Sequence, residues 1–401
     1  MKTFLQPLQN LAEMEEIQKQ AKKNRGILEI SGCMESQKAH LMYGLSGLFP
    51  CHLVIAADEK SAKELYEDYR FYDKRVYYYP AKDLLFFQAD IHGNLLIRQR
   101  MQVIRALLER EDEITVVTSI DGCMDYLVPL EKIEKQLIHF RNDSTLDMDK
   151  LTAALVHMGY ERVGQVEMPG QFSIRGGIID IYSLTEENPW RIELWGDEID
   201  SIRSFDAQSQ RSLENLDDVT IYPAAEQPME KNGVSFLDYF KETETLFFLD
   251  ELNHLEENAK AVQEEFQQSC ENRKEKGEIS LSGDWMCTWE ELCHKINDRN
   301  CVAMSLLDPK KSNWKISGQF NITVKSMSSY QSSFELLVKD LKQYKKEGYQ
   351  IVLLSGSRTR AERLAKDLQE EGLNAFYGQD SGSYSAAGRD HGGVWPCTER
   401  I

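Results

Sequence analysis

Three features are scarce or absent in this 401-residue chain, and each absence excludes a class of protein. Basic residues are outnumbered, with 47 Lys and Arg against 66 Asp and Glu, and the resulting formal net charge of −19 repels a phosphate backbone. The eight cysteines contain no C-x-x-C pair and no regular histidine spacing accompanies them, so neither a metal site nor a disulfide framework is expected. The first twenty residues mix apolar residues with Glu, Lys and Gln and lack the continuous apolar core of a signal peptide or membrane span. We therefore expect a cytoplasmic protein with no membrane partner, and DNA is not its expected direct partner.

The pattern of apolar residues predicts an α/β fold. From about residue 26 to 120, short aliphatic runs such as Gly26–Ser31 and Ile114–Ser119 alternate with helical stretches, which is typical of a parallel sheet with crossover helices. Residues 171–205 are rich in strand patterns separated by turns, and they predict a compact antiparallel insert. The α/β pattern resumes near Val234, so the first domain is expected to be completed after the insert. The predicted units are 1–125, 126–228, 229–325, 326–378 and 379–401.

The first predicted strand leads into GCMESQKA at residues 32–39, the position of a phosphate-binding P-loop, G-x-x-x-x-G-K-[S/T]. Gly32 and Lys38 match this pattern, but Gln37 replaces the second glycine and Ala39 lacks the hydroxyl that would bind Mg²⁺. Glu35 adds a negative charge where a phosphate would bind. The loop is either a weak nucleotide site that uses Lys38 or a plain connection from strand to helix, and we favour the connection.

The run LFFLDE at 246–251 has the form of a Walker B strand, whose acidic end would hold Mg²⁺ opposite a working P-loop. A nucleotide hydrolase that uses Lys38, Asp250 and Glu251 is therefore the rival functional interpretation. Because Gln37 and Ala39 disable the loop, we interpret the two acids as a relic or as ordinary strand-end residues. No catalytic residues are predicted.

The insert carries arginine and aromatic residues among its short strands, and alternation places some of them on one exposed face. They are Arg162, Phe172, Arg175, Tyr182 and Arg191. In the alternative, the aromatic residues are core and the arginines pair with acids on a solvated face, namely Glu167, Glu193 or Glu198. These residues alone leave both alternatives open.

Longer strings resemble one family. The strings GYERV (159–163), PGQFSIRGGIIDI (169–181), RIELWGDEIDSIR (191–203) and YPA (222–224) are similar to the second domain of the transcription-repair coupling factor family (Mfd). YPAKD (79–83) and the helix with Arg98 and Arg100 resemble its first domain, so the similarity covers about residues 1–376. UvrB shares this module, but it has an intact P-loop and an aromatic hairpin that this chain lacks.

The resemblance implies a degenerate P-loop NTPase-like (UvrB-like) domain with a small α+β insert, followed by part of a further α/β domain. It implies that the insert recruits UvrA to stalled RNA polymerase in nucleotide excision repair, with Arg162, Arg175, Phe172 and Tyr182 as contact residues. Full-length members also bind RNA polymerase and move along double-stranded DNA with an ATPase that uses ATP and Mg²⁺. None of those motifs occurs in these 401 residues, so we expect a binding module with no cofactor and no activity of its own.

The last segment departs from the family. Residues 379–401 read QDSGSYSAAGRDHGGVWPCTERI, a composition typical of a disordered tail. The family usually has a segment like PGEIMV followed by RGYEYP here. A coding stretch for QPGEIMVVYGHVQRGYE, read from its third base, gives AGRDHGGVWPCTERI and a stop, which matches residues 387–401. We therefore expect this tail to be frameshifted, which the genomic DNA would test.

Overall fold

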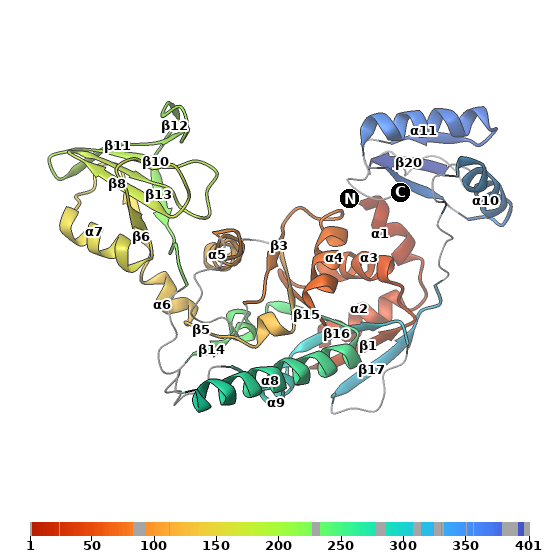
Figure 1. Ribbon diagram of the computed structural model, residues 1–401. Helices are drawn as coiled ribbons and strands as arrows, with labels where there is room; N and C mark the ends of the chain where they lie inside the picture. The colour runs from red at the N-terminus through yellow and green to blue at the C-terminus, as the bar shows by residue number, and fades with distance from the viewer. Residues whose placement is uncertain are drawn as a thin grey trace.

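The computed structural model describes residues 2–23, 25–82, 94–111, 113–226, 233–276, 286–307, 314–324, 330, 333–349, 351–355, 357–378 and 392–396. These residues form a large sheet flanked by helices, a six-stranded sheet to one side of it and a small three-stranded sheet to the other (Figure 1). The predicted α/β fold is confirmed. No helix in the described ranges has the length and apolar character needed to cross a membrane.

The main sheet has seven strands, and all of its paired neighbours are parallel. In spatial order they are β17 (Ile316–Asn321), β1 (Gly26–Ser31), β16 (Asn300–Ser305), β15 (Thr245–Asp250), β2 (Cys51–Ala56), β4 (Ile114–Ser119) and β3 (Val76–Tyr79). Four strands precede residue 120 and three follow residue 244, so the sheet is completed only after a long interruption. The exact domain boundaries stay predictions.

Helices cover both faces of the main sheet because its strands are apolar on both sides. Along β2, Leu53 and Ile55 face one hydrophobic cluster, whereas Val54 and Ala56 face the other. The first cluster is covered by α5 (Asn94–Glu109), α8 (Leu252–Glu275), α9 (Trp289–Asn297) and the 3-10 turns η1 (Asp121–Cys123) and η2 (Phe236–Tyr239). The second is covered by α1 (Lys2–Gln9), α2 (Met14–Lys23), α3 (Glu35–Ser46) and α4 (Glu59–Tyr69).

The interruption holds the six-stranded sheet, which lies beyond α5 in Figure 1. Its order is β12 (Ser212–Leu216), β11 (Glu198–Phe205), β10 (Trp190–Trp195), β9 (Ile178–Ile181), β8 (Gln171–Arg175) and β7 (Glu161–Arg162). All neighbours are antiparallel except β7 and β8. Helix α7 (Met148–His157) packs on one face through Leu151 and Leu155. Shorter elements connect this unit to the rest: α6 (Leu130–Glu134), the pair β6 (Ile138–Arg141) and β13 (Asp218–Ile221), and the pair β5 (Tyr126–Leu127) and β14 (Val234–Ser235).

The third unit is a small parallel sheet in the order β18 (Val352–Ser355), β20 (Gly392–Pro396) and β19 (Ala375–Tyr377), with α10 (Phe334–Lys346) and α11 (Arg358–Glu370). Strand β20 lies inside the segment expected as a disordered tail, and that expectation is wrong for these five residues. The backbone of β20 pairs on both sides, which satisfies its hydrogen-bonding groups. The rest of the tail lies outside the described residues, and the frameshift stays a prediction.

Buried His52 on β2 is expected to make the folding stability depend on pH. The Nε2 atom of His52 lies 2.8 Å from the Ser46 carbonyl oxygen, and Nδ1 lies 3.2 Å from the Thr115 hydroxyl. Burial lowers the pKa of His52 below its usual 6.5, and the hydrogen bonds and nearby Asp73 and Glu113 oppose this only in part. The unfolded chain therefore takes up this proton at a higher pH than the folded chain. The stability due to neutral His52 is complete above pH 6.5 and is lost as the pH falls toward the lower folded pKa.

We expect the free energy of unfolding to fall more steeply in the wild type than in His52→Gln as the pH is lowered from about 7 to about 5. The difference in slope is at most about 1.4 kcal/mol per pH unit. Urea denaturation at each pH measures both slopes, and equal slopes would contradict the assignment.

Candidate functional site

The loop after β1 has the place of a P-loop but is shaped by packing. Gly32 has φ +80°, and a Cβ on it would lie 2.1 Å from the Ile322 carbonyl oxygen. Only glycine therefore fits against the chain that follows β17. Helix α3 begins at Glu35, and its N-cap residue Met34 offers no side-chain cap. The glycine that matches the motif is thus required by the fold, independently of any phosphate.

Lys38 lies among three carboxylates, of which Asp250 is buried, Glu251 is partly buried and Glu35 is exposed. Its side chain is fully buried, and its Nζ donates to Asp250 Oδ1 at 2.6 Å, Glu251 Oε1 at 2.9 Å and Glu35 Oε1 at 2.9 Å. An ammonium group has three hydrogens, so these three bonds use all of its donors. Glu251 also accepts from the Leu306 backbone N–H at 2.8 Å, which ties the cluster to the end of β16.

Burial and ion pairing act in opposite directions on this cluster. Burial by itself lowers the pKa of Lys38, but the charge of Asp250 and the hydrogen bonds that Lys38 donates to the three carboxylates more than offset it, so the pKa lies above its usual value. Burial raises the pKa of Asp250 to about 6, although Lys38 opposes the rise. Both groups are therefore charged at neutral pH. Burial also raises the pKa of the Cys33 thiol to about 12, so this thiol stays protonated.

The cluster is poorly suited to bind a nucleotide. Lys38 has no donor left for a phosphate, and three carboxylates would repel one. Ala39 is fully buried in the core and supplies no hydroxyl for Mg²⁺. Asp250 and Glu251 are ion-pair partners of Lys38. The interpretation of Gly32, Gln37, Lys38 and Ala39 as a connection stays a prediction.

We therefore predict that millimolar MgATP leaves the melting temperature of the chain unchanged in a thermal-shift titration. A nucleotide at about 100 times its dissociation constant would add about 2.7 kcal/mol of stability. Mg²⁺ without nucleotide is the control. A rise in melting temperature that grows with ATP and requires Mg²⁺ would revive the nucleotide-hydrolase interpretation.

The six-stranded sheet has a second polar centre, the buried carboxylate of Asp180 on β9. Its neighbours Ile179 and Ile181 face the core, so alternation turns Asp180 to the opposite side, here called the outer face. Arg175 Nη2 donates to Asp180 Oδ2 at 2.8 Å, and Arg191 donates to both carboxylate oxygens, at 2.7 Å and 2.9 Å. Asp180 is fully buried, whereas the Arg175 side chain is 48% exposed.

Register extends the outer face across four strands. Asp180 pairs with Ser173 on one side and with Arg191 on the other, and Arg191 pairs with Arg203 on β11. The Arg191 guanidinium lies 4.3 Å from the centre of the Phe205 ring, and Arg203 forms an ion pair with Glu193. The outer face therefore presents Arg175, Arg191 and Arg203, held in place by two acids.

The predicted contact residues are not all on this face. Phe172 is fully buried in the core, so its prediction as a contact residue is wrong: in strand alternation it falls on the same side as the core residue Ile174. Exposed Arg162 lies on the edge strand β7 and pairs in register with Phe172, not with Arg175. Tyr182 is half-buried, and its hydroxyl donates to the Glu187 carbonyl oxygen at 2.6 Å.

Two features of the insert were missed from the sequence. The first is Asp180, which holds Arg175 and Arg191 in place. The only sign of this role in the sequence is that an acidic residue stands between two isoleucines. Trp195, at the end of β10, is 82% exposed, which is unusual for tryptophan. Its place before a Gly-Asp turn was the available signal.

Comparison with known proteins agrees with this architecture. The family model of the UvrB interaction domain matches residues 138–226, which hold the six-stranded sheet. The transcription-repair-coupling factor of Bacillus subtilis is 28% identical over 86% of this chain and 35% of its own length. Those of Staphylococcus aureus and Staphylococcus haemolyticus are each 35% identical over about 40% of this chain and 14% of their own length. The chain thus spans about a third or less of these relatives.

The chain is thus an α/β protein in which residues 138–226 match the UvrB interaction domain. Over most of its length it is similar to the transcription-repair-coupling factors, and it spans about a third of the Bacillus subtilis protein.

Proposed function

We propose that this chain recruits UvrA through the outer face of the six-stranded sheet, in transcription-coupled nucleotide excision repair in the bacterial cytoplasm. The observation that carries the proposal is Arg175, which is half exposed and yet fixed by a buried carboxylate. The match of residues 138–226 to the UvrB interaction domain supports the choice of partner.

Arg175 is arranged to bind an acidic group. A guanidinium has five N–H donors, and within the described residues the Arg175 side chain uses only Nη2, toward Asp180. The remaining donors can bind a carboxylate of a partner in a charge-assisted, bidentate manner. Because Asp180 already fixes the side chain, binding costs less conformational entropy.

The relatives are longer than this chain, and we assign their other activities to the regions that the chain does not match. We propose that RNA polymerase and double-stranded DNA are bound by such parts and that ATP is hydrolysed there. The Lys38 cluster supports this division, because its donors are already used by carboxylates. We propose that the chain itself acts without a cofactor.

The test is a calorimetric titration of the chain into UvrA. We expect Arg175→Ala to lose about 2 kcal/mol or more of binding free energy, as a hot-spot residue does. Arg141→Ala is the matched control: it removes the same charge from an exposed position on β6, in another sheet of the same unit, and should change binding by less than about 0.5 kcal/mol. Arg162→Ala tests whether the edge strand contributes.

Melting curves of every variant accompany the titration, so that unfolding is not mistaken for lost contact. If folded wild type does not bind UvrA, the recruitment proposal fails. If wild type binds and a folded Arg175→Ala variant binds equally well, the interface lies elsewhere on the chain.

A further inference from the structure

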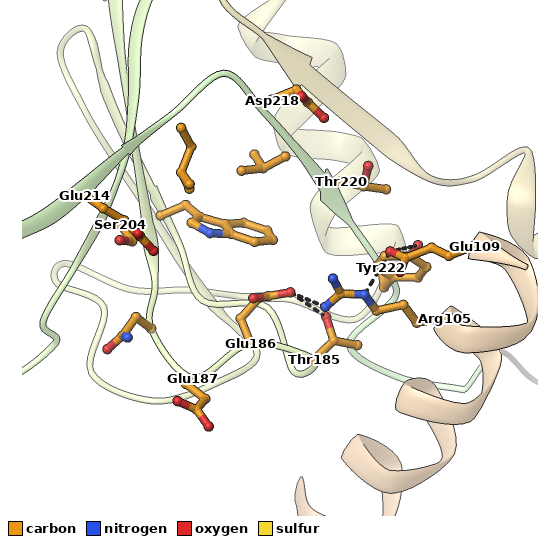
Figure 2. Close-up of a pocket in the computed structure, with 14 residues that line it drawn as sticks. Arg105, Glu109, Thr185, Glu186, Glu187, Ser204, Glu214, Asp218, Thr220 and Tyr222 are labelled. Atoms are coloured by element: carbon orange, nitrogen blue, oxygen red, sulfur yellow. Dashed lines mark hydrogen bonds and ion pairs between the residues drawn. The ribbon is translucent and has the colours of Figure 1, made fainter. Parts of the chain in front are cut away.

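A cavity of about 510 Å³ lies where helix α5 meets the six-stranded sheet (Figure 2). Its lining residues Trp190 and Ser204 alternate along their strands with Arg191 and Arg203, so the cavity lies on the opposite side of the sheet from the outer face.

Side chains that connect α5 to the insert form one wall of this cavity. Arg105 on α5 forms ion pairs with Glu109 and with Glu186 of the insert, and the Tyr222 hydroxyl donates to Glu109 at 3.0 Å. The charge of Arg105 is therefore already matched by two carboxylates.

The remaining lining combines apolar surface with unmatched negative charge. Trp190 and Val219 are buried and Leu216 is half-buried, whereas Glu187, Glu214 and Asp218 are exposed. None of these three carboxylates forms an ion pair within the part of the chain that the structure describes. The cavity thus offers an aromatic and aliphatic surface beside three free acids.

Ser204 supplies an independent sign of a missing partner. It lines the cavity, it is only 5% exposed, and its hydroxyl oxygen has no hydrogen-bond partner among the described residues. A buried hydroxyl without a partner is costly, so such groups are normally bonded. A ligand with an N–H donor would satisfy it.

We propose that this cavity binds an amphipathic organic cation, an ammonium or guanidinium group carried on an aliphatic chain. The methylene groups would pack on Leu216, Val219 and the Trp190 ring, which also attracts a cation through its face. The charged end would donate to Ser204 beside Glu214, while Glu187 and Asp218 lie at opposite ends of the cavity and add to its negative potential (Figure 2). No set of three or more His, Cys, Asp or Glu side chains in the described ranges is arranged to hold a metal ion, so an organic cation fits better. A free polyamine and a lysine side chain of a partner share this chemistry.

Two probes distinguish these sources in calorimetric titrations of the full chain: spermidine, and the blocked tripeptide Gly-Lys-Gly with a norleucine version as its neutral control. We expect Glu187→Gln/Glu214→Gln to weaken binding by about fivefold or more. Glu264→Gln/Glu271→Gln makes the same charge change on α8, outside the cavity, and should leave binding unchanged. Ser204→Ala should weaken binding by about threefold or more without lowering the melting temperature, because its hydroxyl has no partner to lose.

Binding of spermidine alone supports a free polyamine as the occupant, and binding of the lysine peptide but not the norleucine peptide supports a lysine side chain. The proposal is overturned if neither probe binds, or if both pairs of Glu→Gln changes weaken binding equally, which would indicate general charge screening. Neither result depends on UvrA, so this test is independent of the recruitment test.

Discussion

Replacing Lys38 by alanine is expected to lower the free energy of unfolding by about 3–5 kcal/mol. The side chain is fully buried and neutralises Asp250, whose own side chain is 5% exposed. Without Lys38 the carboxylate of Asp250 stays in the interior with no counter-charge, and Glu251 loses a bond at the same point. Urea denaturation with intrinsic fluorescence measures the loss.

The double variant Lys38→Met/Asp250→Asn separates a charge effect from a packing effect. It removes both buried charges together, while Glu35 and Glu251 retain access to water. We expect it to be more stable than the sum of the single changes predicts, because neither charge is left alone. If the two single costs simply add, Lys38 contributes by packing alone and the buried ion cluster has no special role.

The departures from the P-loop motif can be read from the sequence because they are local, whereas the ion-pair partners of Lys38 cannot, because they are far away in the chain. Gln37 and Ala39 differ from the motif within eight residues of chain, which can be read directly. The bond between Lys38 and Asp250 joins residues 212 positions apart, and only the parallel neighbours in the main sheet bring them together. The strands of that sheet were easier to predict, because continuous apolar runs such as Ile114–Ser119 are typical of strands buried on both faces.

The outer face shows where alternation helps and where it fails. Period-two alternation separates Asp180 from Ile179 and Ile181, and it also separates Arg175 from Phe172. The sequence does not reveal the register between strands, and register decides which charges meet: Asp180 pairs across the sheet with Arg191, eleven residues later. Arg175 and Arg191 therefore pair with Asp180, which the sequence analysis did not single out, and not with Glu167.

A second large loss of stability is expected from Arg100→Leu. Arg100 on α5 is fully buried, its guanidinium lies 4.1 Å from the centre of the Tyr79 ring, and it donates to Asp125 at 3.0 Å and to the Pro80 carbonyl oxygen at 2.8 Å. It also forms an ion pair with Glu226, just after the six-stranded unit. Leucine would leave Asp125 buried without a counter-charge, at a cost of about 3–5 kcal/mol. Arg98→Leu removes the same charge from a half-buried position on the same helix and is expected to cost less than about 1 kcal/mol.

At Glu226 the chain returns from the insert to the main sheet. We therefore expect Arg100→Leu to lower stability in the first domain and where the insert joins it. The outer face is held by Asp180 and shares no residue with the Arg100 cluster. At a temperature where the variant is still folded, UvrA affinity should therefore stay within about 0.5 kcal/mol of wild type. Hydrogen exchange should report faster opening near residues 222–226 and unchanged protection in β9 and β10. A parallel loss of protection in β9 would mean that the sheet depends on its attachment to the first domain.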